Sequence, residues 1–131
     1  MEGKLSIWIK GGSFSHSSDL YMKVLIDDKE VWKTDEKDGS SPDWDSTVVK
    51  HIKGEYEKII LKLMDEDTFS RDDVIGTVEF PICDTVSGIN GSFDVKDAED
   101  NSVGTVDVNI NFEEGDVSMF DLLGSMLHKD D

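Results

Sequence analysis

The chain has 131 residues, 37% of them apolar, which suffices for one domain with a single modest core. Its 30 acidic residues outnumber 13 basic ones, and the formal charge of −17 argues against nucleic acid as a partner and against a bare anionic membrane. No apolar run reaches membrane-spanning length. The single cysteine, Cys83, excludes an internal disulfide, and the start "MEGKLSIW" lacks the features of a signal peptide, so we expect a cytoplasmic protein.

Apolar and polar residues alternate along most of the chain, as they do in strands with one buried face. In the first such run, "KLSIWIK", Leu5, Ile7 and Ile9 share one face. Turn-forming residues separate the runs. The pattern predicts eight strands, at about residues 4–10, 20–26, 30–34, 46–53, 57–64, 74–82, 91–96 and 103–112. This indicates an all-β, eight-stranded antiparallel β-sandwich or a barrel, which would occupy residues 1–113.

Residues 114–131 differ from the rest and predict an acidic linker followed by a short amphipathic helix. Apolar residues recur at helical spacing over 118–128, and Ser118 with Asp121 forms a capping pair. Gly124 weakens such a helix by roughly 1 kcal/mol relative to alanine, so the helix needs a surface to dock on. It either covers its own sandwich or is offered to a partner.

The loops divide between two ends if successive strands run antiparallel. Loops 11–19, 35–46, 65–73 and 96–102 then share one end and contain 14 acidic residues with three basic ones. The loops at the other end contain six acidic residues. The negative charge is therefore expected to concentrate on one rim.

Crowded oxygen ligands on loops suit a hard cation, calcium above all, because calcium accepts six to eight oxygens in flexible geometry. Zinc prefers histidine or cysteine, and His16 is the only such residue near this rim. The linear helix-loop-helix calcium motif does not fit "DEDTFSRDDVIG", where Ser70 stands in place of the required glycine. No catalytic motif surrounds any histidine or Cys83, so we do not expect an enzyme.

The segment "LMDEDTFSRDDVIGTVEFPI" resembles the third calcium loop of C2 domains, the calcium- and phospholipid-binding modules of synaptotagmins and conventional protein kinases C. In that family a strand ends in Asp-x-Asp, and a Phe-Ser-like step, an aspartate, two apolar residues and a glycine follow. Asp65, Asp67, Ser70 and Asp73 occupy these positions here. The resemblance implies that these four residues are calcium ligands, whereas Asp72 is a solvated neighbour.

Two further segments resemble the same family in order and spacing. "SSDLYMKVLI" is similar to the family's strand entry and places Asp19 at a ligand position and Tyr21 at the aromatic one. "SPDWDSTVV" is similar to the step on the second loop, with Pro42 and Trp44 matching. The resemblance spans about residues 4–112 and implies a C2-like β-sandwich. With one strand before the first loop, it resembles the permuted, type II topology.

One departure concerns the first loop, which in the family carries a second aspartate upstream of the Asp19 position. No acid lies between Lys10 and Asp19, although serine side chains or backbone carbonyls there are substitutes. We therefore expect one well-formed calcium site, with a second in doubt.

The resemblance implies a calcium-binding module that docks to anionic phospholipid membranes when calcium neutralises its acidic loops, so that a cytoplasmic protein becomes a peripheral membrane one. Phe14 and Phe69 lie on loops of the same rim and are the expected membrane contacts. The alternative is a calcium-regulated or calcium-stabilised protein-interaction module with little lipid binding. In that case the C-terminal helix 118–128 is the expected contact with a protein partner.

Overall fold

The computed structural model describes residues 1–127 and the side chains of residues 1–124. Nine strands and two helices follow in the order β1 (Glu2–Phe14), β2 (Ser18–Ile26), β3 (Lys29–Lys33), β4 (Lys37–Gly39), β5 (Ser46–Lys53), β6 (Lys58–Asp65), β7 (Asp73–Pro81), α1 (Asp84–Ser87), β8 (Ile89–Lys96), β9 (Ser102–Glu114) and α2 (Met119–Leu127). The strands are antiparallel and hydrogen-bonded along one path, β3-β2-β6-β7-β8-β9-β1-β5, while β4 pairs with β2.

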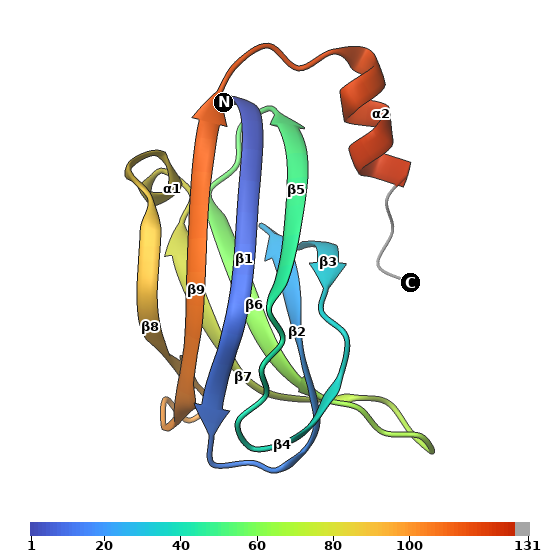
Figure 1. Ribbon diagram of the computed structural model, residues 1–131, viewed down its shortest axis with the longest axis vertical. Helices are drawn as coiled ribbons and strands as arrows, with labels where there is room; N and C mark the ends of the chain where they lie inside the picture. The colour runs from blue at the N-terminus through green and yellow to red at the C-terminus, as the bar shows by residue number, and fades with distance from the viewer. Residues whose placement is uncertain (128–131) are drawn as a thin grey trace.

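This path folds over on itself at the junction of β7 and β8, where the register holds one pair, Thr77 opposite Lys96. The strands β3, β2, β6 and β7 form one layer, and β8, β9, β1 and β5 form the other (Figure 1). The all-β sandwich expected from the alternating pattern is therefore confirmed.

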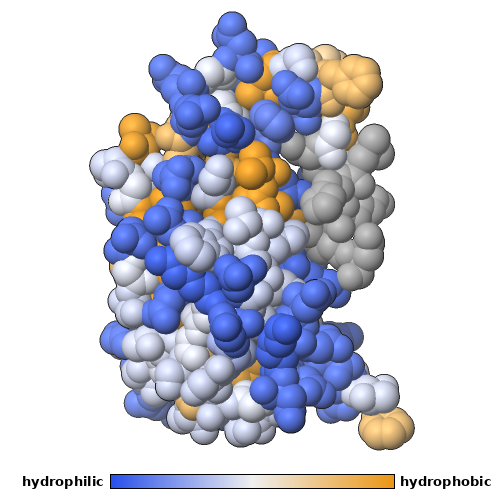
Figure 2. Space-filling model, in the orientation of Figure 1, coloured by the Kyte–Doolittle hydropathy of each residue, from blue (hydrophilic) through white to orange (hydrophobic). Residues whose placement is uncertain are grey.

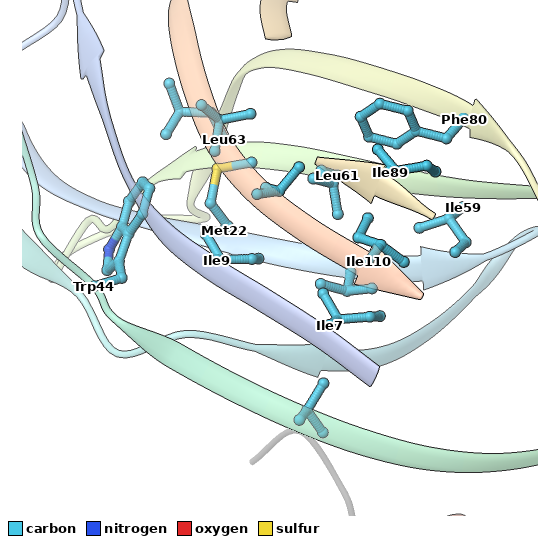
Figure 3. Close-up of a cluster of buried hydrophobic side chains, with 14 of the residues drawn as sticks. Ile7, Ile9, Met22, Trp44, Ile59, Leu61, Leu63, Phe80, Ile89 and Ile110 are labelled. Atoms are coloured by element: carbon cyan, nitrogen blue, oxygen red, sulfur yellow. The ribbon is translucent and has the colours of Figure 1, made fainter. Parts of the chain in front are cut away.

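The core lies between the two layers and consists of the inward residues of each strand. Ile7 and Ile9 of β1 face Leu61 and Leu63 of β6 across the sandwich, and all four are fully buried (Figure 3). The alternation of the sequence is thus the alternation of inward and outward side chains in both layers. Burying this apolar surface is the main source of stability, at about 25 cal/mol per Å².

A β-bulge in β1 changes which residues point inward. The register with β9 shifts between Ile9 and Gly11, so that Ile9 lies opposite Val108 and Gly12 lies opposite Val106. Up to Ile9 the odd-numbered residues face the core, and after the bulge the even-numbered residues do. Phe14, at the end of the strand, therefore points inward.

All eight strands expected from the sequence are present, with β1 and β9 longer than expected. Two short elements had not been predicted: β4, with three residues, and the single-turn helix α1. The C-terminal helix is confirmed, and its first turn is capped by Ser118, whose hydroxyl accepts the N–H of Asp121 at 3.0 Å.

The expected end of this helix, residue 128, lies outside the described residues. The division into 1–113 and 114–131 and the type II topology stay predictions. Among the described residues, no helix is both long and apolar enough to cross a membrane.

Candidate metal centre

The loops that were expected to share one end do so, at the lower end in Figure 1. The N–H of Phe14 donates to the carbonyl of Ser40 at 2.8 Å, which joins the first loop to the second. The N–H of Ser15 donates to the carbonyl of Val103 at 2.9 Å, which joins the first loop to the start of β9. The loop between β6 and β7 projects from the same end (Figure 1). Backbone hydrogen bonds therefore hold the acidic loops together.

We define the acidic rim as seven carboxylates on these loops and strand ends: Asp19, Glu36, Asp65, Glu66, Asp67, Asp72 and Asp73. Asp65 and Asp73 are directly opposite each other in the pairing of β6 with β7. The N–H of Glu66 donates to the carbonyl of Asp19 at 2.9 Å, which brings β2 and β6 together. Like charges directly opposite each other across strands are destabilising, so this pair of carboxylates favours a bound positive charge.

Asp65 is the most enclosed of the predicted ligands, and both of its oxygens have partners. The hydroxyl of Ser18 donates to Oδ1 at 2.6 Å, and Nε2 of His16 lies 3.1 Å from Oδ2. Both partners come from the first loop, the one that lacks the family's second aspartate. Two neutral or weakly basic side chains thus contact Asp65 from that loop.

Asp67 folds its side chain back onto its own loop. Its Oδ1 accepts the N–H of Phe69 at 2.9 Å, and its Oδ2 accepts the hydroxyl of Ser70 at 2.8 Å. Two hydrogen bonds hold the pKa of the Asp67 carboxyl below its usual range. The larger effect comes from the backbone N–H of Phe69 and the smaller from the hydroxyl of Ser70. Ser70 therefore orients Asp67, and the carboxyl of Asp67 stays ionised at neutral pH.

Asp72 is a structural residue rather than the solvated neighbour that the sequence suggested. The hydroxyl of buried Tyr21 donates to Oδ2, and the N–H of Asp67 donates to Oδ1 at 3.0 Å. The hydrogen bond from Tyr21 is the main cause of the lowered pKa of the Asp72 carboxyl. The pKa of the Tyr21 phenol is raised, mainly by burial and next by its contact with Asp72. This contact ties the β6–β7 loop to the outer face of β2.

The pKa of Glu66 is raised by its surroundings in the rim. Partial loss of hydration raises the pKa of its carboxyl, and the charges of Glu36, Asp72 and two further rim aspartates raise it again. Asp19 and Asp73, both predicted ligands, are exposed. The neighbouring carboxylates thus disfavour the charged form of Glu66, and a bound cation would relieve this repulsion.

The donor set of the rim fits calcium, because it consists of carboxylate and hydroxyl oxygens on loops. Within residues 1–127, however, no three side chains of aspartate, glutamate, histidine or cysteine converge to hold an ion as they stand. Asp65 and Asp67 instead face Ser18, His16 and Ser70. The rim has the oxygen donors that calcium prefers, and the side chains of Asp65 and Asp67 are held by hydrogen bonds in this arrangement.

The two aromatic residues that were expected to contact a membrane lie in different environments. Phe14 is only 7% exposed, and its ring lies 6.0 Å from that of Trp44, whose indole N–H donates to the carbonyl of Leu20 at 3.1 Å. Phe69, in contrast, is 96% exposed on the projecting loop. The expectation for Phe14 is therefore corrected, because the bulge in β1 turns its ring into the core, and Phe69 alone stays a candidate.

Sequence reasoning missed several residues of this site. Ser18 contacts Asp65, Glu66 contacts Asp19 through its backbone, and Glu36 raises the pKa of Glu66, yet none of these three had been singled out. His16 had been placed near this rim, but its contact with Asp65 had not been predicted. Glu66 lies between Asp65 and Asp67, and this run of three acids was itself a signal of crowding. The contact of His16 with Asp65 joins residues far apart in sequence, and the sequence contains no signal for it.

The fold and the site together define an all-β binding module with an acidic rim built from several loops. A family model of the C2 domain matches residues 8–96, more than half of the chain. The chain therefore belongs to the C2 domain family, as the resemblance of the loop motifs implied. C2 domains are binding modules without catalytic activity of their own.

Similar proteins are consistent with this assignment. The chain is 29% identical over 85 residues to the ADP-ribosylation factor GTPase-activating protein AGD12 of Arabidopsis thaliana, and the match covers 61% of the chain and 25% of that relative. The matched segment is thus about a quarter of the relative's length. A C2 domain of plant Extended Synaptotagmin 1 superposes with a TM-score of 0.75 at 11% identity, over 88% of this chain and 97% of that one.

A calcium-bound structure of two C2 domains of Extended-Synaptotagmin 2 superposes with a TM-score of 0.67 at 17% identity, over 84% of this chain and 45% of that one. At these identities, the likeness to solved structures shows the fold alone.

Proposed function

We propose that this C2 domain binds calcium at its acidic rim and then docks to anionic phospholipid membranes as a peripheral protein. The observation that carries the proposal is the gathering of carboxylates at one end of the sandwich, where Asp65 lies opposite Asp73 and the N–H of Glu66 donates to the carbonyl of Asp19. Membership of the C2 family and the calcium-bound relative support it.

The proposed ligands are Asp19, Asp65, Asp67 and Asp73, with Ser70 as the residue that orients Asp67. Asp65 would release Ser18 and His16, and Asp67 would release the hydroxyl of Ser70. These hydrogen bonds compete with the ion, so we expect a modest affinity. Calcium, when bound, supplies positive charge against the rim and an open coordination position for a lipid phosphate or carboxylate.

Membrane docking requires the rim to lose its negative charge, because the anionic leaflet otherwise repels it. The rim lies at one end of a domain with a formal charge of −17, and basic residues are few there. The exposed ring of Phe69 projects on the loop that carries Asp65 and Asp67, so it would enter the headgroup layer as these carboxylates are neutralised. Docking would therefore follow the calcium concentration.

The test is thermal unfolding with and without millimolar calcium, on the wild-type chain and on the double variant Asp65→Asn, Asp67→Asn. A ligand at a hundredfold its dissociation constant stabilises by about 2.7 kcal/mol, which is a clear rise in Tm for a domain of this size. A matched control, Asp28→Asn with Glu55→Gln, removes the same charge at the opposite end of the sandwich. We expect the calcium-dependent rise in the wild type and the control but not in the rim variant.

Sedimentation with phosphatidylserine vesicles then separates calcium binding from docking. Calcium-dependent sedimentation that the rim variant loses is the expected result. An unchanged Tm in calcium would refute the metal site itself, whereas a raised Tm without sedimentation would refute only the docking.

A second candidate function, a protein-interaction module, is favoured by a separate observation. The helix α2 presents Met119, Phe120 and Leu123 to solvent and lies away from the acidic rim (Figure 1). Binding of a protein without lipid, weakened by added salt, distinguishes this function from membrane docking.

A further inference from the structure

The start of α2 is fixed on the sandwich. The backbone N–H of Val117, a buried residue, donates to Oε2 of Glu2 at 2.8 Å, and the N–H of Gly115 donates to the carbonyl of Glu2 at 3.2 Å. Ser118 then caps the helix, which lies against β5. The linker therefore sets where the helix begins and which side of it faces away from the sandwich.

The side of α2 that faces away from the sandwich is apolar. Met119 is 71% exposed, Phe120 is 86% exposed and Leu123 is 49% exposed. Leu123 follows Phe120 by three residues and Met119 by four, so both lie next to Leu123 on the helix and the three side chains form a single surface. Apolar residues appear at the same end of the space-filling view (Figure 2). We call this surface the α2 ridge.

The charges around the α2 ridge decide what can cover it. Residues 113–127 contain no lysine or arginine and four acids, of which Glu113 pairs with Lys4 at 3.7 Å while Glu114, Asp116 and Asp121 are exposed. Helices that lie on anionic membranes have lysine or arginine on their polar face, so a membrane is a poor match. A second copy of this chain is equally poor, because each copy has a formal charge of −17.

We propose that the α2 ridge binds a protein partner that presents an apolar groove or face rimmed by lysine or arginine. Helix-in-groove recognition uses apolar residues about one helical turn apart, and the pair Met119 and Leu123 has this spacing. Phe120 is the anchor of the interaction, since buried aromatic residues contribute most to such interfaces. The exposed acids Glu114, Asp116 and Asp121 pair with the basic rim, which sets the register and accelerates association.

This inference develops the second candidate function and does not rest on calcium. The α2 ridge shares no residue with the acidic rim, and the two lie at separate parts of the fold (Figure 1). Measurements in the presence of EDTA therefore test the ridge alone, and the melting experiment in calcium tests the rim alone.

The test uses the full chain with a synthetic amphipathic peptide of leucine and lysine, whose apolar face has a basic rim. Binding is measured by titration calorimetry in EDTA, and the contact is mapped by amide chemical-shift changes. The variant Met119→Ser, Phe120→Ser removes the two most exposed residues of the ridge, and Val86→Ser removes an exposed apolar side chain from α1 as a control. We expect the ridge variant to bind about tenfold more weakly or worse, with unchanged Tm, and the control to bind like the wild type.

Two parallel experiments test whether a membrane or a second copy of the chain covers the α2 ridge instead. Sedimentation with phosphatidylserine vesicles without calcium tests the membrane, and sedimentation velocity of the chain by itself tests self-association. Neither result is expected to depend on Met119 or Phe120. The proposal is overturned if the peptide does not bind the wild type, if it binds the ridge variant equally well, or if the shift changes map to residues 65–73. It is equally overturned if the ridge variant abolishes vesicle binding or self-association in place of peptide binding.

Discussion

The contact between Tyr21 and Asp72 gives a prediction whose size follows from the structure. The variant Tyr21→Phe keeps the ring in place and removes the hydroxyl that donates to Asp72. A hydrogen bond to a charged group contributes about 1.5–3 kcal/mol, and the lower figure applies because Asp72 is only half-buried. We therefore expect the free energy of unfolding at neutral pH to fall by about 1.5 kcal/mol.

The same contact predicts how this loss depends on pH. The hydrogen bond from Tyr21 lowers the pKa of Asp72 in the folded state, so the ionised carboxylate stabilises the fold at pH values above its unfolded pKa of about 4. This contribution disappears as the pH falls through the lowered pKa. The difference between the wild type and Tyr21→Phe should thus be largest at pH 7 and shrink on acidification below about pH 4.

The assay is urea unfolding at a series of pH values, carried out on Tyr21→Phe, on Asp72→Asn and on the double variant. In a double-mutant cycle, the sum of the two single losses should exceed the loss of the double variant, because each single variant removes or weakens the same hydrogen bond. Losses that add fully, or a loss from Tyr21→Phe that is the same at about pH 3 and pH 7, would refute the reasoning. The variant should also weaken calcium binding, because Asp72 holds the backbone of Asp67.

Three further predictions concern single positions. Gly104→Ala should destabilise the fold by more than about 1 kcal/mol in urea unfolding, because φ is +140° and a Cβ would lie 2.2 Å from the carbonyl oxygen of Ser13. Glu66→Gln should raise the Tm of the calcium-free chain at neutral pH, because it removes one of the repelling carboxylates. For the same reason, the increase in Tm on adding calcium should be smaller in this variant. The increase in Tm without calcium should vanish in acid, where Glu66 of the wild type is itself protonated. Phe69→Ser should leave the Tm unchanged and lower calcium-dependent sedimentation with vesicles.

Each of these variants has a matched control in the chain. Gly115→Ala adds the same methyl group in open space and should be nearly neutral. Glu55→Gln removes a carboxylate at the other end and should not change the calcium response. Val86→Ser removes an exposed apolar side chain from α1 and should not affect sedimentation. A control that behaves like its partner would contradict the assigned cause.

The strands were predictable because burial of one face in a sandwich makes apolar and polar residues alternate. Residues such as Ile59, Leu61 and Leu63 show this alternation. It did not predict β4, whose residues Lys37–Gly39 have no apolar alternation and pair with β2 only through the backbone. It also missed α1, a single turn that is too short for a helical period to show.

The candidate site was predictable to the level of loops but not of side-chain contacts. Antiparallel order sufficed to place the acidic loops at one end, because each strand reverses the chain. The turning of Phe14 into the core was not predictable from alternation, since one extra residue in a bulge inverts the pattern that follows it. The contacts of Tyr21 with Asp72 and of His16 with Asp65 depend on rotamers and on loops distant in sequence, which no local pattern encodes.

The length of the strands has a consequence for how the two proposed surfaces work together. β9 has 13 residues, and at about 3.4 Å per residue it spans roughly 40 Å, several times the Debye length of about 8 Å at physiological salt. The start of α2, which follows the far end of β9, is therefore screened from the charge of the rim. The sandwich would act as a rigid spacer that presents a partner at a set height above the bilayer, with the two affinities adjusted independently.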